Sequence, residues 1–160
     1  MHYMEHSPQV GSVVRLVKQR KVEKKIAFEN DEHVLIENRD MLSGYYFSDC
    51  PVGWSELLRQ LFKDIRSVCA NHKCPLPLVL QVKSKFGSLC FYLDHEFDLN
   101  STAGIEVKQV IWEAEMKSYY TCEITGQPAF RYVKDGWFAT LSETIAKELG
   151  YTQRVDFKVC

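Results

Sequence analysis

The chain has 160 residues, 46% of them hydrophobic and 26% charged, which allows one domain with a buried core. Its formal net charge of −1 provides no global field that would favour nucleic acid, a membrane or an acidic ligand. Because it has no signal-peptide pattern and no apolar run near the roughly 20 residues of a membrane helix, we expect a cytoplasmic protein with reduced cysteines.

The N-terminal residues differ from the rest, and we expect a charged arm over 1–44 and an α+β domain over 45–160 that form one cooperative unit. Residues 15–25 carry six basic side chains against one acidic one, whereas residues 29–40 carry five acidic side chains against one basic one. Alternating apolar residues around the acidic stretch favour a hairpin, while a short apolar stripe before it could begin a helix. Of these alternatives we predict strands over about 22–37.

The clearest helix is expected over 53–70. Its apolar residues recur at steps of three and four and therefore share one face: Trp54, Leu57, Leu58, Leu61, Phe62, Ile65, Val68 and Cys69. A polar residue and two prolines within 71–77 end this helix. From Leu78 the apolar period changes to two on both sides of Lys85-Phe86-Gly87, which predicts a β-hairpin with Gly87 at its turn.

After the hairpin, residues 94–101 are polar and acidic and are expected to form a loop. Ser101 or Thr102 can then cap a helix that runs to about Tyr119. The C-terminal elements are a hairpin, a helix and a last strand, expected over 129–141, 142–149 and 154–159. Together these elements predict an α+β fold with two main amphipathic helices packed on a small antiparallel sheet.

The predicted core collects the apolar positions of these elements: Trp54, Leu57, Leu61, Phe62, Ile65, Leu80, Val82, Leu89, Phe91, Ile111, Trp137 and Leu141. The dipeptide Gly-Trp occurs at 53–54 and again at 136–137, each time ahead of a predicted helix. Both tryptophans are therefore expected to anchor the start of a helix in the core.

Residues 120–145 have the spacing of a small zinc ribbon that has lost its ligands. A Cys-x-x-Cys turn and a Cys-x-x-His pair at the start of a helix would surround one zinc ion. Here Cys122 alone keeps a ligand residue, because Thr125, Ser142 and Ile145 occupy the other positions. We expect a metal-free, zinc-ribbon-like hairpin in which Thr125 and Ser142 form hydrogen bonds and Ile145 makes apolar contacts, and we expect no cofactor.

Several motifs follow one another along the chain: Gly53-Trp54-x-x-Leu-Leu, Val82-Lys83-x-Lys85-Phe86-Gly87-x-Leu89-x-Phe91-Tyr92, Ala114-Glu115-x-x-Ser118, Thr121-Cys122-Glu123 and Gly136-Trp137-x-x-Thr140-Leu141. In this order they resemble a family of small, largely uncharacterised bacterial and phage proteins that combine a GW helix, a VKxKFGxLxFY hairpin and a C-terminal CxxC…CxxH ribbon. The resemblance covers about 45–145 and implies no particular reaction. Since three of the four ligand positions differ, the family's zinc is not carried over.

Other reactive residue types have simpler explanations. The pattern Cys69-x-x-His72-x-Cys74 has ligand-like spacing, but Cys69 belongs to the apolar stripe of a helix, and the other two lie in its exit loop. The sequence has no phosphate-binding glycine loop and no serine-nucleophile motif, and most cysteines have packing roles. We therefore expect no catalytic residues and no enzyme.

Charged segments are the remaining candidate sites. Asp94, Glu96 and Asp98, with His95 among them, could serve acid–base or cation chemistry, but docking of a basic partner explains the loop better. The basic run 15–25 could hold phosphates. Four further basic residues lie on the two predicted hairpins and are expected to be separate, solvated side chains: Lys83, Lys85, Arg131 and Lys134.

These observations favour a non-enzymatic protein-binding module, an inhibitor or immunity protein of phage or mobile-element type that blocks a partner's surface. The partner would be a toxin or a component of host or phage defence. The candidate contact residues are Asp94, His95, Glu96, Asp98, Lys21, Lys24, Lys25, Asp31 and Glu32. The alternative function is a nucleic-acid-associated accessory protein that uses the basic segment 15–25.

Overall fold

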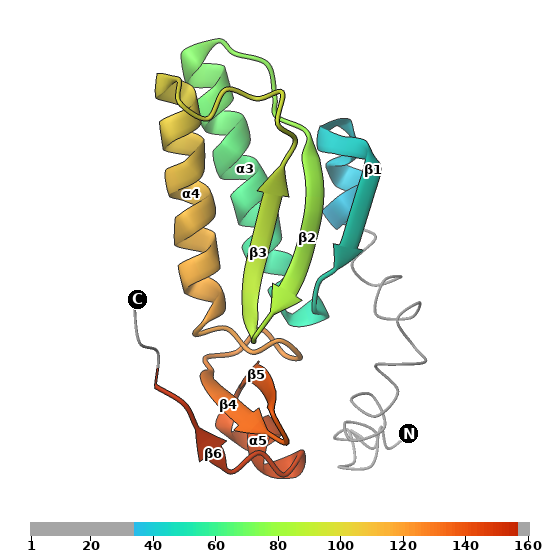
Figure 1. Ribbon diagram of the computed structural model, residues 1–160, viewed down its shortest axis with the longest axis vertical. Helices are drawn as coiled ribbons and strands as arrows, with labels where there is room; N and C mark the ends of the chain where they lie inside the picture. Colours follow the sequence, from blue (N-terminus) through green and yellow to red (C-terminus); the bar gives the residue numbers. More distant parts are fainter. Residues whose placement is uncertain (1–33, 157–160) are drawn as a thin grey trace, which may run out of the picture.

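The structure, a computed structural model, describes residues 34–156, and for residues 45–49 it describes the backbone alone. Two three-stranded sheets and several helices confirm the predicted α+β class (Figure 1). The first sheet has the order β1-β2-β3 and the second the order β5-β4-β6. Within these described residues no helix is long and apolar enough to cross a membrane.

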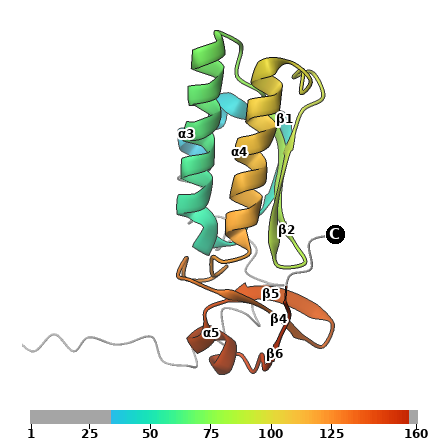
Figure 2. The same cartoon turned by 90° about the vertical axis from the view of Figure 1, so that its left-hand side faces the viewer.

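The first sheet consists of β1 (Leu42–Asp49), β2 (Val79–Lys85) and β3 (Ser88–Leu93). One face of it is covered by α3 (Ser55–His72) and α4 (Thr102–Ser118), which lie side by side (Figure 2). The second sheet consists of β4 (Phe130–Lys134), β5 (Trp137–Leu141) and β6 (Gln153–Arg154), with α5 (Glu143–Glu148) packed against it. The 3-10 turns η2 (Arg39–Met41) and η3 (Val52–Trp54) precede β1 and α3.

The two long helices begin and end where the sequence predicts. The stripe of α3 buries its apolar side chains in the main core: Leu58, Leu61, Phe62, Ile65, Val68 and Cys69. At its C-terminus Lys73 adopts a left-handed conformation (φ 53°), and the amides of Lys73 and Cys74 bond back to the carbonyls of Ala70 and Cys69, a Schellman motif. The amide of Gly104 donates to the Ser101 hydroxyl oxygen (3.0 Å), which caps α4.

The path of β2 corrects one predicted core residue. Val79 and Val82 are both fully buried, whereas Leu80 is 39% exposed. The pairing of β2 with β3 shifts register between Val79 and Gln81, so an extra residue at this point turns the following side chains over. Strict alternation therefore fails at Leu80, and the assignment of Leu80 to the core is wrong.

The first sheet also differs from a purely antiparallel one. The pairing of β2 with β3 is antiparallel, but β1 lies parallel to β2, with Leu42 opposite Val79 and Asp49 opposite Lys83. A parallel pair requires a crossover, and α3 lies between the two strands in the sequence and supplies it. The strand β1 also spans residue 44, where the arm and the domain were expected to divide, and that division stays a prediction.

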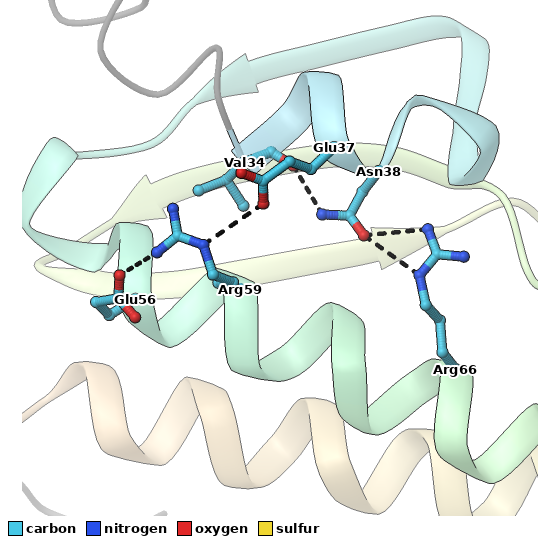
Figure 3. Close-up of polar contacts among 6 residues, drawn as sticks. All are labelled: Val34, Glu37, Asn38, Glu56, Arg59 and Arg66. Atoms are coloured by element: carbon cyan, nitrogen blue, oxygen red, sulfur yellow. Dashed lines mark hydrogen bonds and ion pairs between the residues drawn. The ribbon is translucent and has the colours of Figure 1, made fainter.

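The segment before β1 corrects the predicted hairpin. Residues 34–37 are helical, so the expected strand is wrong there, and its earlier part lies outside the described residues. Val34 is buried in the main core, and the Asn38 side chain donates to the Val34 carbonyl (2.7 Å). As Figure 3 shows, Arg66 of α3 donates to the Asn38 side-chain oxygen (3.1 Å), and Arg59 lies 3.5 Å from Glu37. These contacts fix the segment on α3.

The free edge of β3 is covered by side chains of α4. The Leu89 amide donates to the Ser118 hydroxyl oxygen (2.8 Å), and the Phe91 amide donates to the Glu115 carboxylate (3.0 Å). Ser118 is fully buried and donates its own proton to the Glu115 carbonyl oxygen (2.6 Å). Because these outward amides are satisfied, β3 is a poor template for the addition of another strand.

The Glu115 carboxyl also makes stability depend on pH. Its burial raises its pKa above the ordinary 4.5, although the bond from Phe91 acts in the opposite direction. The folded state therefore binds its proton more tightly, and wild-type stability falls as pH rises from about 4.5 through the raised value. In Glu115→Gln the amide oxygen can still accept from the Phe91 amide. We therefore expect the free energy of unfolding of the variant, measured in urea, to rise relative to that of wild type between pH 4 and 7. A difference in free energy of unfolding that stays constant over this pH range would contradict this role of Glu115.

Among the described residues, three hydrogen bonds join the C-terminal segment 121–140 to the start of α3 and to the β2–β3 hairpin. The Trp54 indole donates to the Thr121 carbonyl (2.9 Å), and the Gly53 amide donates to the Glu123 carbonyl (2.8 Å). The Thr140 hydroxyl donates to the Gly87 carbonyl at the tip of the β2–β3 hairpin (2.5 Å). Trp54 is fully buried, which confirms its predicted role as an anchor at the start of a helix.

At the corner formed by residues 120–145, three predicted side-chain contacts are present, while the likeness to a zinc ribbon stays a prediction. Cys122 and Ile145 are buried in one apolar cluster with the second sheet. The Thr125 hydroxyl oxygen accepts from the Gln127 amide (3.3 Å), and the Ser142 hydroxyl oxygen accepts from the Ile145 amide (3.4 Å). Trp137 is different, because it is 69% exposed and is the first residue of β5 rather than an anchor at the start of a helix. Its assignment to the core is therefore wrong, and the absence of zinc here stays a prediction.

Candidate functional site

Every charged residue on strands β2 to β6 is basic: Lys83, Lys85, Arg131, Lys134 and Arg154. The helices, in contrast, carry both signs, and the acidic residues of the long helices include Glu56, Asp64, Glu106 and Glu113. A chain with a net charge of −1 thus has a local positive field at its strands. This separation of charge makes the strands a candidate binding site for a negatively charged ligand.

Six basic and aromatic side chains make two groups of contacts on the strands of the two sheets, which we together call the strand surface: Lys83, Lys85, Phe86, Tyr92, Arg131 and Phe138. The Lys83 ammonium lies 5.2 Å from the centre of the Tyr92 ring, and the Lys85 ammonium lies 5.6 Å from that of Phe86. The Phe86 and Phe138 rings meet edge to face at 5.9 Å. The Arg131 guanidinium lies 4.4 Å from the centre of the Phe138 ring.

The strand surface lies on the side of the first sheet that faces away from α3 and α4. Val82 and Phe91 are paired, are buried in the main core and point toward the helices. Lys83 and its partner Cys90 are the next pair, so their side chains point to the opposite face, as do Lys85 and Tyr92. In Figure 1 the tip of the β2–β3 hairpin reaches the second sheet, where Phe86 meets Phe138.

The turn that presents Phe86 has an unusual residue for its geometry. Phe86 (φ 52°) and Gly87 (φ 78°) both have positive φ, as a two-residue type I′ turn requires. The second hairpin has the same turn at Asp135 (φ 51°) and Gly136 (φ 77°), with the residue types that such turns prefer. A phenylalanine is strained at this position, yet its ring is 61% exposed. Local strain of this kind is found most often at functional sites.

Arg131 is held by its aromatic neighbour more than by hydrogen bonds. Among the residues that the structure describes, its Nε is the one buried side-chain nitrogen or oxygen without a hydrogen-bond partner. The attraction between the guanidinium and the face of Phe138 offsets part of the cost of burying that group. The arrangement keeps a cation beside exposed aromatic rings.

A thiol lies within the strand surface. Cys90 is a free, partly exposed cysteine, and it is paired with Lys83. The neighbouring Cys90 raises the pKa of Tyr92 above its ordinary value of 10, chiefly because the two groups repel each other when both are ionised. Cys90 is therefore a natural probe of what covers this surface.

The acidic loop predicted as a contact site has an internal role as well. The Asp94 carboxylate accepts from the Glu96 amide (3.0 Å), and the Asp98 carboxylate accepts from the Asn100 amide (2.9 Å). The His95 side chain is 94% exposed and lies 3.2 Å from Asp94. These bonds shape the loop, and its contact with a basic partner stays a prediction.

The other predicted contact residues lie outside the described part of the chain: Lys21, Lys24, Lys25, Asp31 and Glu32. The basic run 15–25 lies there too. Nothing in the structure therefore tests the role of the N-terminal arm.

The residues Cys69, His72 and Cys74 do not converge on one point. Cys69 is buried in the main core, where desolvation and the neighbouring Cys74 raise its pKa to about 11. His72 instead lies 2.9 Å from the Glu106 carboxylate on α4. Across residues 34–156 no three His, Cys, Asp or Glu side chains gather as a possible metal site.

The strand surface corrects the expectation that the basic residues of the hairpins are separate. Lys85 and Arg131 are joined through Phe86 and Phe138, and Lys83 lies on the same face of β2 as Lys85, whereas Lys134 donates to the Leu149 carbonyl (2.7 Å) on the α5 side of the second sheet. The sequence contained one usable signal, because no acidic residue interrupts the alternating stretches at 79–85, 88–93 and 130–141 apart from the turn residue Asp135.

A scan against models of known protein families found no match to this chain, and searches of curated proteins and of solved structures found none either. The resemblance to the bacterial and phage family described above stays a prediction. The case for a function therefore depends on the geometry of the strand surface.

Proposed function

We propose that this protein binds single-stranded nucleic acid through the strand surface and acts as a nucleic-acid-associated accessory protein. The observation that carries the proposal is the pairing of cations with aromatic rings on the strands, in which Lys83 contacts Tyr92, and Lys85 and Arg131 are joined through Phe86 and Phe138. Proteins that bind single strands combine the same two groups, because phosphates are attracted to Lys and Arg and bases stack on aromatic rings.

The rings suited to stacking are Phe86, which is 61% exposed, and Tyr92, which is 43% exposed. Each carries a lysine near its ring, so a base stacked on it would place its phosphate close to a positive charge. Single strands fit better than duplexes, since their bases are free to stack. The proposal transfers the nucleic-acid role from the N-terminal basic run to the strands.

The inhibitor or immunity role remains a second proposal, with contacts at the acidic loop 94–98. Asp94 and Asp98 are partly engaged in shaping that loop, but Glu96 and the exposed His95 can meet a basic protein. The strand surface favours a polyanion instead. A protein partner would release few counterions on binding. A nucleic acid releases counterions from each phosphate that a lysine or arginine pairs with, so its affinity falls as the salt concentration rises.

The variant Phe86→Asn separates stacking from stability. Asn-Gly is the preferred pair for a type I′ turn, so the hairpin should fold at least as well, while the exposed ring is lost. We expect the affinity for a fluorescent oligothymidylate to fall about tenfold, the effect of one lost stacking contact. Fluorescence anisotropy at several salt concentrations measures this, and thermal unfolding checks the fold.

The salt dependence of binding separates the contribution of the phosphate contacts from that of base stacking. The strand surface has three cations, so log K against log salt should have a slope of about −2 for a single strand. Phe86→Asn should lower the affinity with that slope unchanged, and Trp112→Ala on α4, which removes another exposed ring, should change neither. Equal affinity of wild type and Phe86→Asn, or a slope near zero, would contradict the proposed function.

A further inference from the structure

The solvent side of α3 and α4 contains a groove of about 440 Å³. Its floor is apolar and is formed by Leu57 and Leu61 of α3 with Val110 and Ala114 of α4. Leu61 and Ala114 are buried, whereas Leu57 and Val110 are only partly buried against the core. The volume is within the range of protein ligand sites and can hold a few apolar side chains.

The rim of the groove is predominantly acidic. Asp64 comes from α3 and Glu113 from α4, together with Glu56, which is paired with Arg59, and the lining has one cation, Lys117. Two amide side chains hold the carboxylates in place: Gln60 donates to Asp64 (2.7 Å) and Gln109 donates to Glu113 (3.0 Å). An occupant must therefore combine an apolar stripe with positive charge.

We propose that this groove binds an amphipathic helix of a protein partner, with leucine-like residues on the floor and lysines or arginines at the acidic rim. A helix suits the groove because α3 and α4 lie side by side, and a third helix can pack its apolar stripe into the furrow between them (Figure 2). The groove lies on the opposite side of the first sheet from the strand surface, so the two sites are independent.

The test uses a synthetic peptide of about 15 residues, with leucines at steps of three and four and lysines elsewhere. Its control has the same composition in an order that spreads the leucines around the helix. We expect the patterned peptide to bind and the control to bind at least tenfold more weakly by isothermal titration calorimetry. Equal binding of the two peptides would overturn the proposal, since a general attraction of charges would then suffice.

Substitutions at the rim test whether the peptide binds in the groove. Asp64→Asn combined with Glu113→Gln retains the size of both exposed side chains and should weaken the patterned peptide about tenfold. Asp135→Asn, an exposed residue of the turn between β4 and β5, is the matched control and should bind as wild type does. An unchanged affinity of the double variant would overturn the proposal. Oligothymidylate binding should be unaffected by the double variant, so failure here is distinguishable from failure of the proposed function.

Discussion

Replacing Trp54 with alanine is expected to lower the free energy of unfolding by about 3–5 kcal/mol, the usual cost of deleting a buried aromatic side chain. Trp54 is 0% exposed, and it belongs to the main core. The change also removes the donor to the Thr121 carbonyl (2.9 Å), a bond that joins the start of α3 to the segment between α4 and β4. Urea unfolding followed by circular dichroism measures the loss.

The other two tryptophans provide matched controls. Trp112 is 55% exposed and Trp137 is 69% exposed, so Trp112→Ala and Trp137→Ala should each change the free energy of unfolding by about 0.5 kcal/mol or less. A cost for Trp137→Ala close to that of Trp54→Ala would contradict the structure and would restore the core position that the sequence predicted.

The variant Gly53→Ala should be nearly as damaging, with a loss of about 3 kcal/mol or more. A Cβ at position 53 would lie 2.6 Å from the carbonyl carbon and 2.7 Å from the carbonyl oxygen of Glu123, and closer still to the Cys122 carbonyl oxygen. These are backbone atoms, so no side-chain rotation can relieve the overlap. The same backbone contact includes the bond from the Gly53 amide to the Glu123 carbonyl (2.8 Å).

Gly44→Ala is the control for a general effect of removing glycine. Among the described atoms, none would lie within 4 Å of a Cβ at Gly44, and its φ is not in the left-handed region. We expect this variant to unfold at the urea concentration of wild type, or slightly above it, because alanine reduces the freedom of the unfolded chain. If Gly53→Ala unfolded at the same urea concentration as Gly44→Ala, the close approach of residues 53 and 123 would be refuted.

Much of the fold could be predicted because the helices and hairpins have clear periods. The apolar stripe of α3, the Ser101 cap of α4 and the turn at Gly87 are local signals, and each lies where it was expected. Errors arose where distant residues decide the outcome. The bulge beside Leu80 depends on pairing with β3, and the exposure of Trp137 depends on how the second sheet packs.

The candidate site could not be predicted for the same physical reason. Its central contact joins Phe86 to Phe138, which are far apart in the sequence, and only the packing of the hairpin tip on β5 brings them together. Considered one hairpin at a time, Lys85 and Arg131 are ordinary solvated residues. The acidic loop, by contrast, was predicted as a contact site from its composition alone, although its carboxylates also accept hydrogen bonds within the loop.

The two proposed sites carry opposite charges, although the chain as a whole is nearly neutral. The basic residues of the first sheet lie on one side, and the acidic groove between α3 and α4 lies on the other, so the two fields are kept apart. A protein of this kind could hold a nucleic acid strand and a basic protein helix at the same time.

The most direct test of the central claim is the alkylation of Cys90 in the presence and absence of oligothymidylate. Cys90 lies beside Lys83 and Tyr92 on the strand surface, whereas the partly exposed Cys74 lies at the end of α3 and serves as the internal control. Peptide mapping after brief treatment with N-ethylmaleimide should show slower modification of Cys90 with the oligonucleotide bound and an unchanged rate at Cys74. Equal rates at Cys90 under conditions where the oligonucleotide is bound would contradict the proposal that nucleic acid covers the strand surface.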